Sequence, residues 1–277
     1  MSKKVIFFDV DGTLVSQDNT MPVSTQNAIN LARENGHYCF VCTGRSNIST
    51  QDVLQYDFDG YIASAGGYIK VGDKLIYHSS LSQENVNLAL NCFKENNILY
   101  NIETDDATYM DKDMIEAFFI PMITKEWTLE KIIERENKYF NFKSIQEFVN
   151  HPVDVQKFSF IAKDELQLKI VEETLGDKYH IVVHKNFSFD GKIAGEIIIK
   201  ENDKGVGIQR VMDYLDIDMK ESICFGDSMN DAPMMLACFT SIAMGNGDAQ
   251  VKKLASRVTE SVEEDGIYNE LKRMHII

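Results

Sequence analysis

The chain has 277 residues, of which 28 are basic and 43 are acidic, so its formal net charge is −15 with histidine neutral. Its length allows one large domain or two smaller ones, and its hydrophobic and charged fractions, 44% and 26%, exclude a disordered chain. A negative field of this size repels DNA and anionic lipid, so neither nucleic acid nor a membrane is an expected partner, and a phosphate-bearing ligand must be held by a metal or a few placed donors.

The first part of the chain alternates apolar strands with helices. Residues 5–8 form a continuous apolar run, which predicts a strand buried on both faces of a parallel sheet. A helix with Ser24 as its N-cap and Gly36 as its stop follows, then a strand over residues 38–42, another helix, and a strand over residues 61–64. This order predicts the start of a doubly wound α/β sheet.

The middle of the chain has a different rhythm. Residues 69–77 predict a hairpin that turns at Gly72-Asp73, and from about residue 82 helices mix with short strands. Helices are expected near residues 86–93, 129–138 and 164–175, and strands near 98–103, 107–110, 157–162 and 179–183. We expect residues 83–187 to form an α+β domain inserted into a discontinuous core of residues 1–82 and 188–277.

The doubly wound pattern is expected to return in the last part of the chain. Strands over residues 196–199, 222–225 and 241–244 alternate with helices around residues 208–215, 229–237 and 248–255, and a last helix runs through Leu271. The fold class that follows is a doubly wound, mainly parallel α/β core with an inserted α+β domain.

The cysteine content and the apolar stretches indicate a cytoplasmic protein. The first apolar run is too short for a signal peptide, and the longest uncharged stretch, residues 232–247, is shorter than the ~20 apolar residues of a spanning helix. The five cysteines are odd in number and lack the spacing of a disulfide framework, which favours a reducing compartment. Cys39 and Cys42 lie on one predicted strand, facing opposite ways, and are expected to be core thiols.

Two carboxylates follow the first predicted strand. Asp9 and Asp11 lie at the carboxyl edge of the sheet, where open α/β sheets bind ligands. Residues two apart on an extended chain face the same side, about 7 Å apart. One carboxylate can therefore act as a nucleophile while the other exchanges protons, although the segment alone would more simply be an exposed acidic turn.

Three further predicted element ends carry groups that suit a phosphoryl ligand. Thr43, Gly44 and Arg45 follow the second strand, where a hydroxyl and main-chain N–H groups suit a phosphate oxygen. Lys204 begins a helix after a strand and can neutralise a phosphoryl oxygen. Residues 226–231, Gly-Asp-Ser-Met-Asn-Asp, close another strand and add two carboxylates. Each segment alone is more often a cap, a turn or a surface charge, but the four together favour catalysis.

Carboxylates gathered at one edge of a sheet need a cation. Two unit charges 4 Å apart repel by about 4 kcal/mol at an effective dielectric constant of 20, and a third carboxylate raises the cost beyond what one lysine offsets. The ligand set is all oxygen, and the chain has no Cys/His cluster with zinc spacing. The sequence therefore predicts Mg²⁺ as the cofactor.

The four segments, in this order and at these spacings, resemble the motifs of the haloacid dehalogenase superfamily of phosphatases. The long insertion between the second and third segments is similar to the Cof-type branch, whose α+β cap covers the active site, and residues 243–246 and 264–267 resemble the closing segments of that branch. The resemblance implies a Rossmann-like core with a cap, and a Mg²⁺-dependent hydrolase of a small phosphorylated metabolite such as a sugar phosphate.

The resemblance also implies roles by position. Asp9 would attack phosphorus and form an aspartyl phosphate, and Asp11 would protonate the leaving oxygen and then accept a proton from water. Mg²⁺ would be held by the carboxylate of Asp9, the main-chain carbonyl of Asp11, and Asp227, with Asp231 as a further ligand or an outer partner. The phosphoryl group would be bound by Thr43, Lys204 and Asn230 and by main-chain N–H groups around Gly12 and Gly44.

Two positions depart from the Cof-type pattern. Ala65 lies in a run where many members carry Asn-Gly, and Gly247 follows Asn246 where alanine is usual. Neither position is one of the matched catalytic residues. They bear on substrate contacts and on local loop geometry.

Substrate specificity is expected to reside in the cap. Lys157, His184 and Lys185 are candidates for contacts with the remote part of a substrate, although a basic residue on an acidic protein is more often a salt-bridge partner. Arg45 has two interpretations, a contact with the substrate or a pair with a structural carboxylate. The sequence makes no prediction of oligomeric state.

Two other functions stay open on the sequence alone. A phosphomutase keeps both Asp9 and Asp11 and differs in whether the cap admits water or a second phosphosugar. A non-enzymatic sensor of a phosphorylated metabolite needs no covalent nucleophile, so the intact acidic pair disfavours it.

Overall fold

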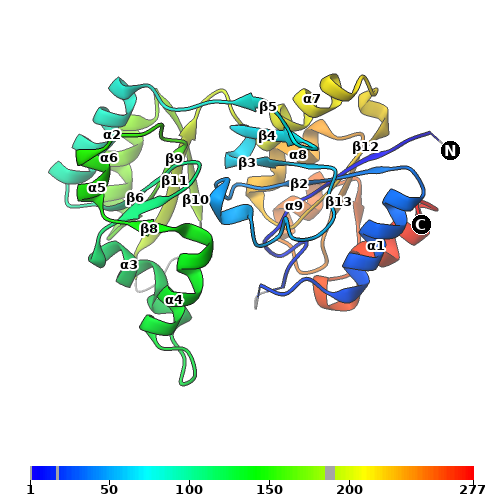
Figure 1. Ribbon diagram of the computed structural model, residues 1–277, viewed down its shortest axis with the longest axis horizontal. Helices are drawn as coiled ribbons and strands as arrows, with labels where there is room; N and C mark the ends of the chain where they lie inside the picture. The colour runs from blue at the N-terminus through cyan, green and yellow to red at the C-terminus, as the bar shows by residue number, and fades with distance from the viewer. Residues whose placement is uncertain (1, 17–18, 185–190) are drawn as a thin grey trace. The chain divides into compact units, whose positions relative to one another are not determined.

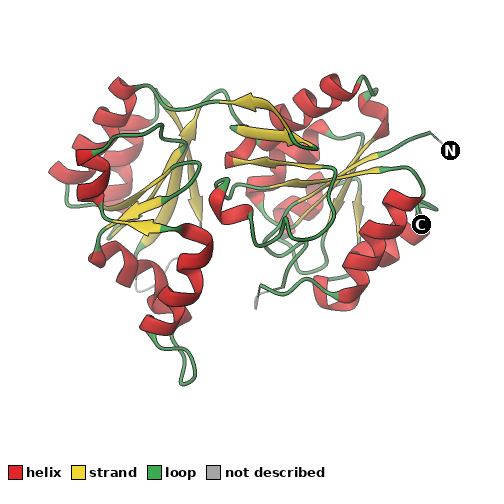
Figure 2. Ribbon diagram, viewed as in Figure 1, coloured by secondary structure: helices red, strands yellow, loops and turns green. Residues whose placement is uncertain are grey.

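The chain folds into two compact units, each with its own sheet (Figures 1 and 2). The computed structural model describes residues 2–16, 19–184 and 191–277. The first unit comprises Met1–Arg45, Val53–His78 and Asn202–Ile277, and the second comprises Ser46–Asp52 and Ser79–Glu201. The domain boundary expected near residue 188 lies outside the described residues.

The first unit is built on an eight-stranded sheet in the order β14-β13-β12-β1-β2-β3-β4-β5. The strands from β14 to β3 run parallel, and β4 and β5 are antiparallel additions at one edge. The strands are β1 (Val5–Phe8), β2 (Tyr38–Cys42), β3 (Gly60–Ala63), β4 (Tyr68–Val71), β5 (Lys74–His78), β12 (Ser222–Gly226), β13 (Thr240–Ala243) and β14 (Arg257–Val258). The expected doubly wound, mainly parallel core is confirmed.

Helices cover both faces of this sheet (Figure 2). They are α1 (Val23–Glu34) and α10 (Gly266–Arg273) on one face, and α7 (Lys204–Leu215), α8 (Ala232–Ala237) and α9 (Ala249–Leu254) on the other. The residues of β1 alternate between the two layers: Ile6 and Phe8 pack with α1 and α10, and Val5 and Phe7 pack with α7 and α8. Because successive strand residues face opposite ways, a fully apolar strand needs a layer on each face.

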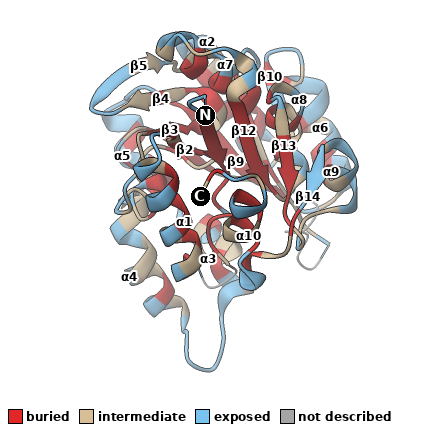
Figure 3. Ribbon diagram, turned by 90° about the vertical axis from the view of Figure 1, so that its right-hand side faces the viewer, coloured by how far each residue is buried: buried red, intermediate tan, exposed pale blue. Residues whose placement is uncertain are grey.

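The central strands β1 and β12 are buried along their whole length, as the red ribbon of β12 in Figure 3 shows, and the polar segment follows β1 directly. β1 is flanked by β12 and β2 in parallel register, with Phe8 opposite both Phe225 and Val41. The carboxyl ends of these three strands therefore meet at one edge of the sheet. The hairpin predicted over residues 69–77 is confirmed by the antiparallel pairing of β4 and β5.

The second unit has a six-stranded sheet in the order β10-β11-β9-β6-β7-β8, antiparallel except for the parallel pair β7 and β8. Its strands are β6 (Leu99–Glu103), β7 (Thr108–Met110), β8 (Phe142–Lys143), β9 (Lys157–Ala162), β10 (Tyr179–His184) and β11 (Ile193–Ile199). Its helices are α2 (Gln83–Glu95), α3 (Lys112–Phe119), α4 (Leu129–Phe140), α5 (Ile145–Asn150) and α6 (Glu165–Leu175). The expected α+β character of this part of the chain is confirmed.

The core of the second unit lies between its sheet and α2, α5 and α6. Phe93 of α2 packs against Phe158 and Phe160 of β9, with ring centroids 5.8 and 6.1 Å apart. A smaller cluster on the sheet includes Met114 of α3 and Ile161. The second unit thus has an apolar core of its own.

The prediction that residues 196–199 form a strand of the α/β core is wrong. They belong to β11, which pairs antiparallel with β10 and β9 in the second unit. An apolar run indicates that a strand is buried, but it does not indicate to which sheet the strand belongs. The strand that precedes Lys204 is therefore not a strand of the parallel sheet.

Two local predictions in the first half of the chain are also wrong. α1 begins at Val23 after Pro22, and Ser24 lies inside the helix, where its Oγ donates to Asp265 Oδ1 at 2.5 Å instead of capping. Between β2 and β3 the structure has a short 3-10 turn, Ile48–Thr50, in place of the expected helix. Ser and Thr hydroxyls in that segment bond to nearby main-chain carbonyls, which competes with helix formation.

The expectation about the cysteines is confirmed. All five are free and buried, and Cys39 and Cys42 belong to the apolar layers on opposite faces of the first sheet. Burial raises the pKa of both thiols, so they are unreactive core residues. Within the described ranges, no helix is both long and apolar enough to cross a membrane.

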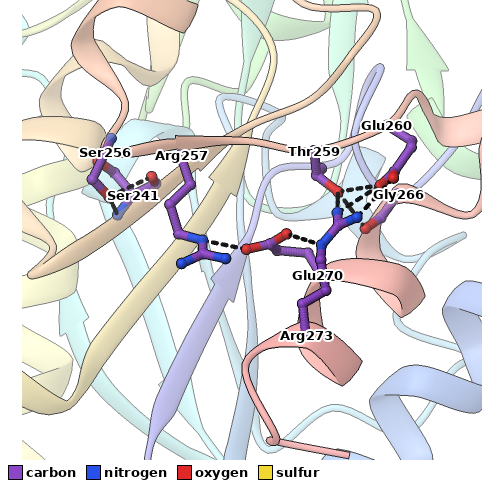
Figure 4. Close-up of polar contacts among 8 residues, drawn as sticks. All are labelled: Ser241, Ser256, Arg257, Thr259, Glu260, Gly266, Glu270 and Arg273. Atoms are coloured by element: carbon purple, nitrogen blue, oxygen red, sulfur yellow. Dashed lines mark hydrogen bonds and ion pairs between the residues drawn. The ribbon is translucent and has the colours of Figure 1, made fainter.

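A polar network fastens the C-terminal helix to the edge of the first sheet (Figure 4). Glu270 of α10 is buried and accepts hydrogen bonds from Arg257 of β14 and from Arg273 Nε. Arg273 also donates to both carboxylate oxygens of Glu260 at 2.7 Å, which holds the pKa of Glu260 at about 2. The last helix is therefore tied to the short edge strand by charge-assisted hydrogen bonds as well as by its apolar face.

Candidate active site

A buried lysine bridges two carboxylates at the carboxyl edge of the first sheet. Asp9 follows β1 directly, and its Oδ1 lies 2.5 Å from Lys204 Nζ, the first side chain of α7. The same ammonium donates to Asp231 Oδ1 at 2.5 Å. The three side chains are at most 5% exposed. Strand β1, helix α7 and the turn after β12 thus bring their charges together away from water.

Main-chain hydrogen bonds explain why these segments converge. Asp9 N donates to Phe225 O at 3.0 Å, which ties the end of β1 to the end of β12. Beyond β12, the main-chain N–H groups of Asp227 and Ser228 donate to Asp231 Oδ2 at 2.8 and 3.1 Å. Asp231 therefore closes its own turn with one oxygen and meets Lys204 with the other.

Three carboxylates at this edge suit a hard cation. Ligand oxygens of Asp9, Asp227 and Asp231 lie within 4.8 Å of one another. Asp227 Oδ1 is buried and has no hydrogen-bond partner within the described part of the chain, so it is free to bind an ion. An all-oxygen set of this kind fits Mg²⁺ or a related divalent cation.

The main chain at Gly12 approaches this cluster closely. A Cβ built at Gly12 would lie 2.4 Å from Asp227 Oδ2, and the residue has a φ of +78°. Both features require glycine, because other residues disfavour positive φ and any side chain would displace the carboxylate. The close approach of the Asp227 carboxylate is therefore one reason why position 12 must be glycine.

Burial and mutual repulsion disfavour the charged forms of this cluster. Burial raises the pKa of Asp9 well above its usual range, the charge of Asp231 raises it further, and Lys204 opposes both. Burial and then Asp231 raise the pKa of Asp227 to about 7. For Lys204, burial lowers the pKa, but Asp231 and Asp9 outweigh burial and the pKa stands above its ordinary value. One ammonium does not satisfy three carboxylates.

We expect the metal-free variant Asp227→Asn to exceed the wild type in stability by more at pH 8 than at pH 5. The unfolded Asp227 loses its proton near pH 4 and the folded one near pH 7, so the unfolded state binds fewer protons in between and stability falls as pH rises. The shift of roughly three pKa units corresponds to at most about 4 kcal/mol. Urea unfolding in EDTA at the two pH values measures it, and an equal difference at both would contradict it.

Asp11 lies outside the group of three carboxylates. Its carboxylate pairs with Arg45, Nε to Oδ2 at 3.0 Å and Nη2 to Oδ1 at 2.6 Å, and its side chain is 65% exposed. Of the two interpretations of Arg45, the structure shows the pair with a carboxylate. The two carboxylates therefore have different surroundings, since Asp9 is buried and Asp11 is largely exposed to solvent.

The other residues expected to bind phosphate lie in the same unit as Asp9. Thr43, at the end of β2, is buried, and its Oγ1 accepts from Arg45 N at 3.1 Å. Gly44 follows it and is half-buried. Asn230 Oδ1 accepts from Ser228 Oγ at 2.8 Å. The ends of β1, β2 and β12 thus carry the first, second and fourth motifs, and α7 carries the third.

Asn246 is a site residue for which the sequence indicated no role. Its Nδ2 donates to Gly12 O at 2.8 Å and its Oδ1 accepts from Val262 N at 3.1 Å, so it ties the Gly12 turn to the last part of the chain. The signal in the sequence that could have identified Asn246 was the resemblance of residues 243–246 to a closing segment of the Cof-type branch. At the next residue, Gly247, a Cβ would lie 2.6 Å from Asp227 O, so this departure accommodates the main chain beside Asp227.

Comparison with known proteins identifies the family. The family model of haloacid dehalogenase-like hydrolases matches residues 6–271. The chain belongs to this family. Its relatives include 5-amino-6-(5-phospho-D-ribitylamino)uracil phosphatase YitU of Bacillus subtilis (strain 168), 28% identical over 97% of this chain and 96% of that one, and the putative phosphatase YkrA of the same organism, 24% identical over the whole of both.

Solved structures share the fold of this chain. A hypothetical protein from Geobacillus kaustophilus HTA426 aligns with a TM-score of 0.82 over the whole of both chains at 22% identity. The subclass IIB sugar phosphatase BT4131 aligns with a TM-score of 0.77 at 26% identity, over 99% of this chain and all of that one. The chain is a Cof-type phosphatase of the superfamily that its motifs resemble.

The three candidates for substrate contacts predicted from the sequence fall in the second unit and differ from one another. Lys157 begins β9, is buried, and lies 2.7 Å from Glu196 Oε1 and 3.4 Å from Glu103 Oε1. Lys157 is therefore a salt-bridge partner, the second of the two roles that its sequence allowed. His184 ends β10, where its main chain pairs with Ala194. Lys185 lies outside the described residues.

Proposed function

We propose that this phosphatase hydrolyses a small-molecule phosphate monoester, with Mg²⁺ as cofactor and Asp9 as nucleophile. The observation that carries the proposal is the buried Asp9 carboxylate in contact with Lys204, beside the unpartnered Oδ1 of Asp227. A structural ion pair would need neither a third carboxylate nor an unused buried oxygen. A nucleophile that meets a phosphoryl group and a cation needs both.

The proposed chemistry has two steps. A carboxylate oxygen of Asp9 attacks phosphorus, forming an aspartyl phosphate as the bond to the leaving oxygen breaks, and Asp11 gives that oxygen a proton. Water then attacks phosphorus and gives a proton to Asp11, and the bond between phosphorus and the Asp9 oxygen breaks, so that phosphate is released and the Asp9 carboxylate is restored. Lys204 donates to Asp9, and its positive charge favours the ionised form of that carboxylate against the opposing effect of burial.

The remaining roles follow from the placement of the motifs. When bound, Mg²⁺ would neutralise charge on the carboxylates and phosphoryl oxygens, and its ligands would be Asp9, the main-chain carbonyl of Asp11, Asp227 and Asp231. The proposed phosphoryl ligands are Thr43, Lys204, Asn230 and the N–H groups around Gly12 and Gly44. These donors are supplied by separate elements of one unit, so that the phosphoryl site is preorganised by the fold.

The second unit is the proposed source of specificity. We propose that residues 83–187 are a cap inserted into a core of residues 1–82 and 188–277, and that the substrate is a sugar phosphate or a related metabolite of the cytoplasm. The names of the relatives support this class: one acts on a phosphorylated ribitylaminouracil, another is an HMP-PP phosphatase, and BT4131 is a sugar phosphatase. Because Lys157 is neutralised by two glutamates, His184 and Lys185 are the better candidates for substrate contacts.

A substrate panel tests the proposal. The purified chain is assayed for phosphate release from sugar phosphates, nucleotides, phosphorylated ribitylaminouracil and aryl phosphates, each with Mg²⁺ and with EDTA. Metal-dependent release, with kcat/KM values that rank one class above the others, is expected. Tight binding of an ester without release in Mg²⁺ would instead support a sensor, and transfer to a second phosphosugar in preference to water would support a phosphomutase.

A further inference from the structure

The pair between Arg45 and Asp11 joins two of the four motifs. The planar guanidinium meets both carboxylate oxygens, at 3.0 and 2.6 Å, and Nη2 also donates to Asn19 Oδ1 at 3.0 Å. The arginine is the more enclosed partner, with 19% of its side chain exposed against 65% for Asp11. The largely buried guanidinium of Arg45 thus holds the largely exposed carboxylate of Asp11.

The main chain of Arg45 is held on both sides. Its N–H donates to Thr43 Oγ1 at 3.1 Å, and its carbonyl accepts from Ser64 N, beyond the end of β3, at 2.7 Å. Asp11, in contrast, lies in the turn after β1, where Gly12 has positive φ. The side chain of Asp11 would sample several rotamers in water, and a bidentate fork on a fixed main chain selects one of them.

We propose that Arg45 is a positioning residue for Asp11, holding the carboxyl group that gives a proton to the leaving oxygen; this inference rests on the proposed function. When the proton moves from Asp11 Oδ1 to the leaving oxygen, the bond from phosphorus to that oxygen breaks and the carboxylate meets both guanidinium donors, as in the structure. While Asp11 Oδ1 carries the proton, Arg45 Nε still donates to Asp11 Oδ2, and Arg45 Nη2 still donates to Asn19 Oδ1.

The pair contributes little to folding, so its role is one of orientation. Exposed ion pairs contribute little to stability, because solvent screens them and holding two long side chains costs entropy. A general acid must lie within hydrogen-bond reach of the oxygen that it protonates, and such catalysis accounts for roughly 10²- to 10⁴-fold in rate. Loss of the fork therefore affects proton delivery far more than it affects the fold.

The test varies the acidity of the leaving group. kcat/KM is measured in Mg²⁺ for wild type, Arg45→Ala and Arg45→Lys with an alkyl phosphate, phenyl phosphate, 4-nitrophenyl phosphate and 2,4-dinitrophenyl phosphate. We expect Arg45→Ala to lose on the order of 10²-fold with the alkyl ester, where the leaving oxygen needs a proton. With the dinitrophenyl ester, whose leaving oxygen needs none, the loss is expected to be at most a few-fold.

The lysine variant separates orientation from charge. Lysine keeps the positive charge but lacks the planar fork, so Arg45→Lys is expected to fall between wild type and Arg45→Ala and to show the same dependence on the leaving group. Should Arg45→Ala fail to fold, the lysine variant alone still tests the trend.

Arg33 offers a matched control. It forms a bidentate pair with Asp59 in the same unit, with both distances 3.2 Å, and its side chain is 32% exposed. Arg33→Ala is expected to match the wild type with every ester, and thermal melts of all variants check folding. Equal losses across the ester series, or no loss with any ester, would overturn the role of Arg45. A wild type that hydrolyses none of the esters would instead overturn the proposed function itself.

Discussion

Asp9→Asn is expected to lower kcat by at least about 10³-fold without loss of the fold. The amide has nearly the shape of the carboxylate, but it lacks the charge and the nucleophilic oxygen that would attack phosphorus. Because burial and Asp231 raise the pKa of Asp9, removal of its charge relieves repulsion in the metal-free site. The variant is therefore expected to melt no lower than the wild type in EDTA, which separates a catalytic defect from unfolding.

The control for this variant is Asp203→Asn, which changes the same charge one residue before Lys204. Asp203 caps α7 by accepting from Val206 N at 2.7 Å, and asparagine is an equally good cap, so activity should stay near that of the wild type. Acid quench during turnover, followed by peptide mass spectrometry, is expected to find a phosphoryl group on the peptide that contains Asp9. Turnover by Asp9→Asn comparable to the wild type would disprove the assignment of the nucleophile.

Lys204→Met is expected to destabilise the metal-free protein by about 3–5 kcal/mol at pH 8, because removing one partner of a buried ion pair leaves uncompensated charge. The ammonium contacts two carboxylates at 2.5 Å in a site that excludes water. Mg²⁺ is expected to restore more stability to this variant than it adds to the wild type, since the cation then meets carboxylates that no lysine neutralises. Urea unfolding with EDTA and with Mg²⁺ measures both effects.

Lys157→Met is the matched comparison for this prediction. Lys157 is equally buried between two carboxylates, those of Glu196 and Glu103, but in the second unit. Its removal is expected to destabilise the protein without changing the stabilisation by Mg²⁺. An equal Mg²⁺ increment for Lys204→Met and Lys157→Met would show that the cation does not bind beside Lys204.

The sequence predicted the parallel sheet and the carboxylate cluster because both depend on local patterns. The apolar run of β1 requires a buried strand, and a polar residue directly after such a strand lies at the edge of the sheet. The same logic applies to Asp227 and Asp231 after β12, the neighbour of β1. Parallel strands end at one edge of the sheet, but these charges meet because the strand order places β12 next to β1.

The predictions that proved wrong concern patterns that are compatible with more than one partner. The apolar residues of β11 would fit either sheet, and only antiparallel pairing with β10 and β9 assigned them to the second unit. Ser24 has the chemistry of a cap, but Pro22 starts the helix and the hydroxyl bonds Asp265 from the far end of the chain.

The sequence by itself determined which residues of this phosphatase are buried and which motifs end its strands, because hydrophobic periodicity and turn chemistry act over a few residues. The tertiary structure alone decided the partners: Arg45 for Asp11, Asn246 for the Gly12 turn, and two glutamates for Lys157. Each of these contacts joins segments far apart in the chain. A charge or an amide on one segment is compatible with many partners, and only the packed fold brings one of them within hydrogen-bond distance.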